Sequence, residues 1–262
     1  MIKLKGHSGC SLIFIKKEGN LIIRKTSKNL NYNTRLENQC LKQLNFKHEF
    51  IKTPKIYEYG LNEAGLYYFD MEYIKGFKFN EYIKIKLFNQ VLDNFNKIID
   101  FIFGNFSSNK SNFYNEIVLK IDSINKTKLI DNHLIDQLKL QANLDINTGY
   151  CHGDLTFENI IISNEEIYLI DFLDSYIESP IIDISKLFQE FDLNWSNRNY
   201  ESDNAISLIR NIFLKRNLND RISNLSVNTL CIDLQRKLTL MRILPYTDSI
   251  SMQLKLLNKI NK

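Results

Sequence analysis

The sequence is poor in proline and cysteine. Only three prolines occur in 262 residues, so no stiff proline-rich linker separates parts of the chain. The four cysteines, Cys10, Cys40, Cys151 and Cys231, lie far apart and lack the close pairs typical of a zinc site. Cysteines without such a pattern favour reduced thiols. We therefore expect a cytoplasmic protein without a structural metal.

The sequence also lacks a strong charge imbalance and long apolar runs. The 34 basic and 30 acidic side chains leave a net charge of +4, and the lysines are scattered along the chain. A nucleic-acid-binding protein would need a concentrated basic patch. The apolar runs are shorter than the roughly 18 residues that span a bilayer, and the N-terminus does not resemble a signal peptide. We expect no nucleic acid and no membrane insertion, and the oligomeric state is left open.

The pattern of apolar residues changes from that of strands to that of helices. Early β-rich runs with turn signals predict three antiparallel strands, then a helix over residues 33–46 and a strand–turn–strand over residues 55–74. From about Phe79 the apolar residues recur with a helical period. We predict an α+β fold with a small lobe, made of a sheet and one helix, over residues 1–75 and a mostly helical lobe over residues 76–262. The first helix should bury one apolar face, made of Leu36, Cys40, Leu41 and Leu44.

The stretch YCHGDLTFENIIISNEEIYLIDF, residues 150–172, combines two apolar runs with acids and an amide. The runs IIIS and IYLI around NEE predict a tight hairpin. Because a hairpin returns its last residue to where its first began, Asn159 and Asp171 should lie at the same end. Their oxygens suit Mg²⁺, which keeps phosphates and water as its other ligands. Asp154, just upstream, could orient an attacking hydroxyl and accept its proton.

Each of these residues has an ordinary structural interpretation. Asp154 and Asn159 could be turn residues, and Asp171 could cap the end of a strand. The hairpin, however, gives one geometric reason for all three spacings. Together they therefore indicate a phosphate-transfer site.

These motifs resemble those of the aminoglycoside phosphotransferase and choline kinase family, whose members are small-molecule relatives of the protein kinases. CHGDLTFENIII resembles the family's catalytic loop, LIDFLD its metal-binding segment, and SPIIDISKL the start of its next helix. The resemblance implies a bilobal protein-kinase-like fold, ATP and Mg²⁺ as cofactors, and Asp154 as the catalytic base. It also implies that Asn159 and Asp171 bind the metal, and that His152 and Asp183 support the loop. An acid at the position of Asp183 would also suit the first turn of a helix.

The N-terminal residues resemble the family's nucleotide-binding elements. GHSGCS resembles the loop over the ATP phosphates, which implicates Gly6, Ser8 and Gly9. In LIIRK, strand alternation allows only one of Arg24 and Lys25 to point inward. We expect Arg24 to bind the phosphates, because family members often carry Arg after the apolar triplet.

Two further elements complete the predicted nucleotide site. Glu37 resembles the helix acid that pairs with the phosphate-binding cation, although a solvated helix acid is the alternative. YYFDMEYIKG resembles the hinge that contacts adenine, here around Glu72, Tyr73 and Ile74.

The sequence departs from the protein kinases in ways that indicate a small acceptor. Gly153 replaces the Arg of His-Arg-Asp, and Leu173 replaces the Gly of Asp-Phe-Gly. The eleven residues between Asp171 and Asp183 leave no room for a peptide-docking activation loop. We therefore predict a kinase that transfers the γ-phosphate of ATP to a hydroxyl of a small molecule.

The acceptor is less well defined by the sequence. Choline, ethanolamine or a sugar are the first candidates, and an aminoglycoside kinase or a non-catalytic pseudokinase are the alternatives. The residues expected near the acceptor are Asp174, Trp195, Tyr200, Arg242 and Tyr246.

Overall fold

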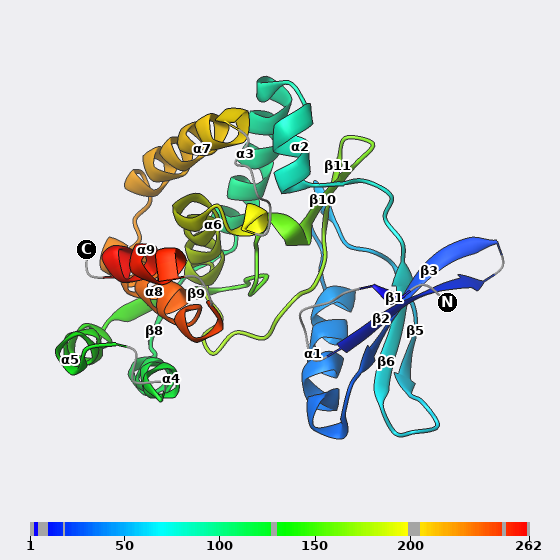
Figure 1. Cartoon of the computed structure of the whole chain (residues 1–262), viewed down its shortest axis with the longest axis horizontal. Coiled ribbons are helices and arrows are strands. Elements are labelled where there is room, and N and C mark those ends of the chain that lie inside the picture. The colour runs from blue at the N-terminus through cyan, green and yellow to red at the C-terminus, as the bar shows by residue number, and fades with distance from the viewer. Residues whose placement is uncertain are drawn as a thin grey trace. The chain divides into compact units, whose positions relative to one another are not determined.

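The computed structural model describes residues 3–4, 10–17, 19–126, 130–198, 205–247 and 250–260. The chain forms two compact units (Figure 1). Unit 1 comprises Met1–Phe79 and Asn159–Asp174, and unit 2 comprises Asn80–Glu158 and Ser175–Lys262. Each unit is described by itself.

Unit 1 contains a five-stranded antiparallel sheet in the order β1-β2-β3-β6-β5. Helix α1, Asn33–Leu44, follows a short 3₁₀ turn, η1, Leu30–Tyr32, and lies along this sheet (Figure 1). The core between the sheet and α1 includes Cys10, Leu36, Cys40, Tyr67, Phe69 and Met71. The predicted strand, helix and strand pattern is confirmed. The strands are β1 Lys3–Leu4, β2 Cys10–Lys17, β3 Asn20–Ser27, β5 Ile56–Leu61 and β6 Tyr67–Glu72.

The buried face of α1 differs from the predicted one. Leu36 and Cys40 are buried as expected, whereas Leu41 and Leu44 are exposed. Two amide side chains, Gln39 and Gln43, are buried instead. Both make hydrogen bonds, and Gln43 donates to the carbonyl oxygen of Pro54 at 2.8 Å. A hydrogen-bonded amide can occupy a buried helix position at little cost. The pattern of apolar residues alone therefore predicted the buried face of α1 incorrectly.

The hairpin predicted within residues 150–172 is confirmed. Strands β10, Ile160–Ser163, and β11, Glu166–Leu169, pair antiparallel from Ile160↔Leu169 to Ser163↔Glu166. Asn164 and Glu165 form the two-residue turn, and both have positive φ, at 48° and 67°. Two left-handed central residues are typical of the tight turns that match strand twist.

This hairpin is part of a second sheet in unit 1, with the order β4-β11-β10-β7. The outer strands are the two-residue segments β4, Ile51–Lys52, and β7, Phe77–Lys78. Their pairing explains why residues 159–174 group with the N-terminal part of the chain, and why unit 1 extends to Phe79. The sequence had suggested a single boundary after residue 75.

Unit 2 is mostly helical. Its one small sheet, among the described residues, pairs β8, Phe106–Asn112, with β9, Asp145–Gly149. Helix α6 packs against α7 and α8 (Figure 1), and Phe191 is its one residue that is not buried. The helices are α2 Phe79–Ile85, α3 Phe88–Gly104, α4 Tyr114–Asn125, α5 Asn132–Gln141, α6 Ile181–Leu193, α7 Ala205–Ser223, α8 Thr229–Met241 and α9 Ile250–Ile260, and the 3₁₀ turns are η2 Phe157–Asn159, η3 Trp195–Asn197 and η4 Leu244–Tyr246.

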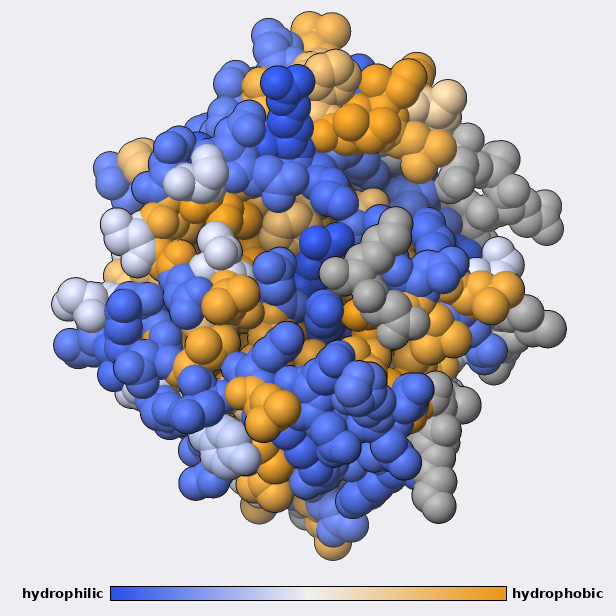
Figure 2. Space-filling view, turned by 90° about the vertical axis from the view of Figure 1, so that its left-hand side faces the viewer, coloured by the Kyte–Doolittle hydropathy of each residue, from blue (hydrophilic) through white to orange (hydrophobic). Residues whose placement is uncertain are grey.

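One face of the molecule is mainly polar. Figure 2 shows a face on which hydrophilic residues predominate and apolar residues form separate patches. Across the part of the chain that the structure describes, no helix is both long and apolar enough to cross a membrane.

Candidate active site

The loop that contains Asp154 is anchored from below by Asp183. The buried carboxylate of Asp183 accepts hydrogen bonds from the backbone N–H groups of His152 at 2.6 Å and Gly153 at 2.9 Å. Gly153 has φ of +91°, a conformation that side chains with a Cβ rarely adopt. The buried ring of His152 accepts the N–H of Asp154 through Nδ1 at 3.2 Å. His152 therefore lies within the loop and Asp183 beneath it, as predicted.

Glu190 holds the other end of the same loop. Its Oε1 accepts the backbone N–H of Phe157 at 3.0 Å, and its Oε2 accepts the backbone N–H of Ser196 at 3.0 Å. The hydroxyl of Ser196 donates to Oε1 at 2.6 Å. Burial raises the pKa of Glu190 to about 7, although these donors oppose the shift. Glu190 was not among the residues predicted from the sequence.

We expect the contribution of Glu190 to the free energy of unfolding to decrease as the pH rises. A carboxyl whose pKa is raised in the folded state binds more protons there than in the unfolded state, between about pH 4.5 and 7. Its contribution to the free energy of unfolding is therefore greatest below that window and is lost as the pH rises through it. Between pH 5.5 and 8 the loss should be about 2 kcal/mol. Thermal unfolding of the wild type and Glu190→Gln at both pH values tests this, because the variant should lose less; equal losses would contradict it.

Asp154 is paired with a buried lysine, Lys186, that was not predicted from the sequence. Lys186 of α6 lies with Nζ 2.7 Å from Oδ1 of Asp154, and its side chain is 6% exposed against 27% for Asp154. Burial alone would raise the pKa of Asp154, but Lys186, Arg242 and His152 together hold it below the usual value. Burial and the nearby Arg242 lower the pKa of Lys186, against the opposing effect of Asp154. Asp154 is therefore an ionised carboxylate beside two cationic side chains of unit 2.

Unit 1 also contains a lysine–aspartate pair, Lys25 with Asp171. Nζ of Lys25 lies 2.8 Å from Oδ1 of Asp171 and 3.0 Å from Oε1 of Gln39 on α1. Burial would lower the pKa of Lys25, but the carboxylate of Asp171 outweighs it and raises the pKa. Asp171 has φ of +60°. A left-handed conformation costs a non-glycine residue about 1–2 kcal/mol, and such strain is concentrated at functional sites.

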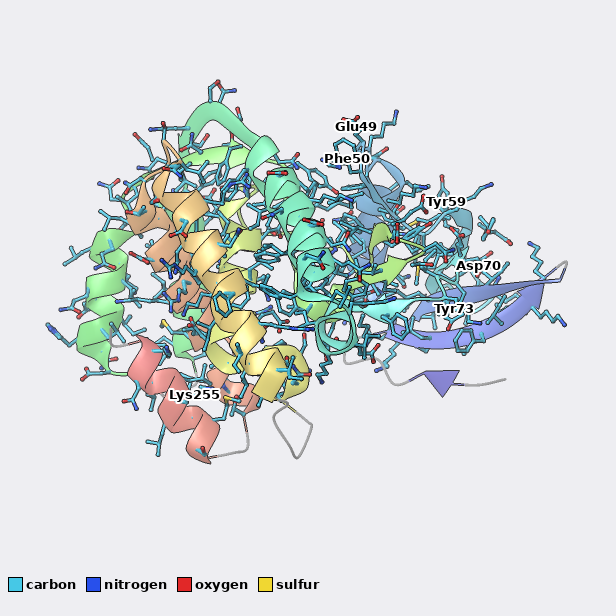
Figure 3. All side chains as sticks on the ribbon, turned by 90° about the horizontal axis from the view of Figure 1, so that it is seen from above. Glu49, Phe50, Tyr59, Asp70, Tyr73 and Lys255 are labelled. Carbon is cyan, nitrogen blue, oxygen red and sulfur yellow. The ribbon has the colours of Figure 1, made fainter. Side chains whose placement is uncertain are left out.

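The choice of Arg24 as the inward-pointing cation is wrong. Arg24 donates from Nε and Nη2 to the two carboxylate oxygens of Asp70, at 2.6 and 2.8 Å, and its guanidinium lies 4.3 Å from the ring centre of Tyr68. Asp70, labelled in Figure 3, is the cross-strand neighbour of Arg24 on β6. Alternation along β3 then directs Lys25 to the face that α1 covers.

Glu37 does not provide the helix partner of this cation. Glu37 is exposed, and the α1 side chain that contacts Lys25 is Gln39. The two residues are two positions apart and therefore lie on different faces of the helix. The signal that could have found Gln39 is its spacing from Leu36 and Cys40, with which it shares the buried face.

The predicted hinge lines a cavity of about 600 Å³ within unit 1. Tyr73, labelled in Figure 3, forms a T-shaped pair with Phe14 on β2, with 5.3 Å between the ring centroids. Gly76 approaches β10 closely, because an added Cβ would lie 2.5 Å from the carbonyl oxygen of Ile162. The residues that line this cavity are Glu72, Tyr73, Ile74, Lys75, Gly76, Phe77, Ser163, Asn164 and Tyr168.

Asn159 and Asp171 lie at the same end of the hairpin, as the sequence predicted. The N–H of Ile170 donates to the carbonyl oxygen of Asn159 at 3.0 Å, which extends the β10–β11 pairing to the residue before Asp171. Asn159 is buried, and the side chain of Asp171 is 41% exposed. One amide and one accessible carboxylate fit a magnesium ion that takes its other ligands from phosphates and water. Their role as ligands stays a prediction.

The residues predicted to lie near the acceptor are divided between the two units. In unit 1, the exposed Asp174 accepts a hydrogen bond from Asn38 at 2.6 Å. In unit 2, the guanidinium of Arg198 lies 4.1 Å from the ring centre of Trp195 and its Nη1 lies 3.4 Å from the carboxylate of Glu158. Arg242, which follows α8, acts electrostatically on Asp154. Several predicted residues lie outside the described residues, namely Gly6, Ser8, Gly9, Tyr200 and the side chain of Tyr246.

A comparison with protein-family models connects this site to a known class. The model of the phosphotransferase enzyme family, abbreviated APH, matches residues 123–205. That segment contains the Asp154 loop, the hairpin and helix α6.

Solved structures share the fold at low sequence identity. A thermostable mutant of the aminoglycoside phosphotransferase APH(4)-Ia, solved with ADP and hygromycin B, is similar with a TM-score of 0.70 and 13% identity, over 99% of this chain and 92% of that one. A proposed fructosamine-3-kinase from Haemophilus somnus 129PT has a TM-score of 0.56 and 16% identity, over 100% of this chain and 92% of that one. The predicted α+β kinase-like fold is therefore confirmed.

Curated relatives match a shorter segment. A probable bifunctional tRNA threonylcarbamoyladenosine biosynthesis protein from Methanosarcina mazei is 40% identical over 60 residues, which is 21% of this chain and 11% of that protein. The match thus spans about a tenth of the length of that relative. The family model nevertheless confirms, over residues 123–205, the resemblance predicted from the motifs, and the solved structures show the same fold.

Proposed function

We propose that this protein transfers the γ-phosphate of ATP, in the presence of Mg²⁺, to a hydroxyl of a small molecule, with Asp154 as the base. The observation that carries this proposal is the ionised, partly exposed carboxylate of Asp154 on a loop anchored by Asp183 and Glu190. A carboxylate held in this way can accept a proton without first losing one.

The nucleotide would be held by groups of unit 1. Lys25 offers a buried positive charge for the α- and β-phosphates, and Asn159 and Asp171 offer oxygen ligands for the metal. The cavity at Glu72–Phe77 would take the adenine ring. When bound, Mg²⁺ would supply charge neutralisation on the phosphates. A similar solved protein was obtained with ADP, and another form of it with AMP-PNP, which supports a nucleotide as the donor.

In the proposed reaction, Asp154 orients the acceptor hydroxyl and receives its proton. The acceptor oxygen forms a bond to the γ-phosphorus while the bond between that phosphorus and the β–γ bridging oxygen breaks, and ADP leaves. The chemistry needs little else from the protein, because phosphoryl transfer depends mainly on positioning and electrostatics.

The charges beside Asp154 favour an uncharged acceptor, such as a sugar, over a cationic one. Lys186 and Arg242 both act on Asp154, so one carboxylate faces two cations there. A cationic alcohol such as choline, or a polycationic aminoglycoside, would meet these two cations beside the base, which disfavours its binding there.

An acceptor screen tests the proposed function. Purified protein with ATP and Mg²⁺ should release ADP in the presence of sugars or sugar derivatives, and more slowly with choline, ethanolamine or aminoglycosides. Release without any acceptor gives the background rate. ADP release that never exceeds this background would contradict the proposal, and preferential turnover of aminoglycosides would contradict the choice of acceptor.

A further inference from the structure

Helix α6 presents three buried charged side chains to the Asp154 loop. Asp183, Lys186 and Glu190 are spaced three and four residues apart, so they lie along one face of the helix. Asp183 binds the start of the loop and Glu190 binds its end, both through backbone N–H groups. Lys186, between them, is the one of the three that contacts the side chain of Asp154.

The surroundings of Lys186 do not suit a purely structural ion pair. Its Nζ is buried and, apart from the contact with Asp154, has no hydrogen-bond acceptor among the described residues. By contrast the buried carboxylate of Asp192 is contacted by Lys215, Arg236 and Lys259. Burial of an ammonium with a single partner is costly, and a hydrophobic side chain of similar size often stabilises the fold as well or better. Lys186 is therefore poorly explained by stability.

The segment of the loop that follows Asp154 contains no cationic side chain. The four residues between Asp154 and Asn159 are Leu, Thr, Phe and Glu. The groups that act on Asp154 are His152, within the loop, and two side chains from elsewhere in unit 2, Lys186 on α6 and Arg242 after α8. Of these, Lys186 is in direct contact, and the groups that face it in turn are Asp154, Arg242 and Glu190.

We propose that Lys186 is a positioning residue for the base: it holds Oδ1 of Asp154 and keeps the carboxylate ionised, so that Oδ2 is directed to the acceptor hydroxyl. This inference rests on the proposed function. The proton of the hydroxyl passes to Oδ2, and the proton count of Lys186 does not change. Lys186 thus acts through Asp154 without touching the substrate.

Three variants test this role. Lys186→Met removes the charge and keeps the length of the side chain, Lys186→Arg keeps the charge, and Lys215→Met removes a lysine from an ion pair of the same length, 2.7 Å, that does not involve Asp154. The measurement is the pH dependence of kcat with saturating ATP and acceptor, together with the Tm of each variant.

Lys186→Met should lower kcat by about 10- to 100-fold and move the acidic limb of the pH profile upward, because Asp154 loses its nearest cation. The KM for ATP should change little. Lys186→Arg should restore the position of the acidic limb, and Lys215→Met should leave it unchanged. A variant that does not fold would be recognised by the loss of a thermal unfolding transition. A folded variant that lacks only a structural contact would keep the wild-type pH dependence of kcat.

The outcomes separate this inference from the proposed function. An active Lys186→Met variant whose acidic limb coincides with that of the wild type would overturn the inference alone. If Lys186→Met does not fold, Lys186→Gln, which also removes the charge but keeps a polar end, is measured in its place, and an acidic limb that coincides with that of the wild type overturns the inference. A wild type without acceptor-dependent ADP release would overturn the proposed function, and the role of Lys186 with it.

Discussion

Asp154→Asn is expected to abolish acceptor-dependent ADP release. Asparagine has nearly the same shape as aspartate but cannot take the proton of the acceptor hydroxyl, and loss of a general base typically costs about 10²- to 10⁴-fold in rate. The binding of ATP should persist, because the proposed nucleotide contacts come from Lys25, Asp171 and the hinge cavity. The expected result is a fall in kcat with little change in the stabilisation of the protein by ATP and Mg²⁺.

The control for this variant addresses the buried lysine that it leaves behind. Removing the carboxylate deprives Lys186 of its partner, and an uncompensated buried charge destabilises the fold. The double variant Asp154→Asn with Lys186→Met removes both charges and should recover stability without recovering activity. If Asp154→Asn keeps more than about a tenth of wild-type kcat, the assignment of the base is wrong. Such a loss of less than about tenfold would be smaller than the smallest effect expected when a general base is removed.

The hairpin and its ends could be predicted from the sequence because their signals are local. Two apolar runs separated by a polar turn determine the pairing of β10 with β11. That pairing then brings Asn159 and Asp171 to one end without information from the rest of the chain. Asp183 was predicted through the family motif, and its hydrogen bonds to the loop agree with that expectation.

The orientation of β3 could not be predicted in the same way. Alternation shows that Arg24 and Lys25 point in opposite directions, but only the packing of α1 against the sheet decides which face is inside. Asp70, 46 residues later in the sequence, offers Arg24 a bidentate partner on the outer face. That partner depends on the register of β3 with β6, which no local pattern specifies.

Lys186 and Glu190 were missed because they interrupt an apolar helix. In an amphipathic pattern, charged residues are assigned to the solvent side, yet nearly all of α6 is buried. Helix α6 is surrounded by protein, and its polar side chains find their partners in the Asp154 loop and in Ser196. The spacing of Lys186 and Glu190 from Asp183 was the signal that could have revealed them.

The two-residue strands β4 and β7 were also invisible in the sequence. Each is too short for an alternation of apolar and polar residues, and each exists because the hairpin offers it an edge. These long-range pairs explain why the hairpin belongs to unit 1, although it follows the first helices of unit 2 in the sequence.

Lys25→Met is expected to impair the use of ATP far more than Arg24→Met. Both substitutions remove one positive charge from adjacent positions on β3, so the pair is matched in sequence and in chemistry. Lys25 contacts Asp171, the proposed metal ligand, whereas Arg24 contacts Asp70 and Tyr68 on the opposite face. Loss of a buried cation aimed at the phosphates should lower kcat/KM for ATP by about 10²-fold or more, and the loss of Arg24 should change it by less than about threefold.

Two measurements separate binding from folding in this pair. The rise in Tm on addition of ATP and Mg²⁺ reports nucleotide binding, since a ligand that binds only the folded state stabilises it. It should be reduced in Lys25→Met and retained in Arg24→Met. The Tm without nucleotide should fall more in Arg24→Met, because that variant leaves the buried carboxylate of Asp70 without its bidentate partner. Equal losses of kcat/KM in the two variants would show that Lys25 has no special role in holding the phosphates.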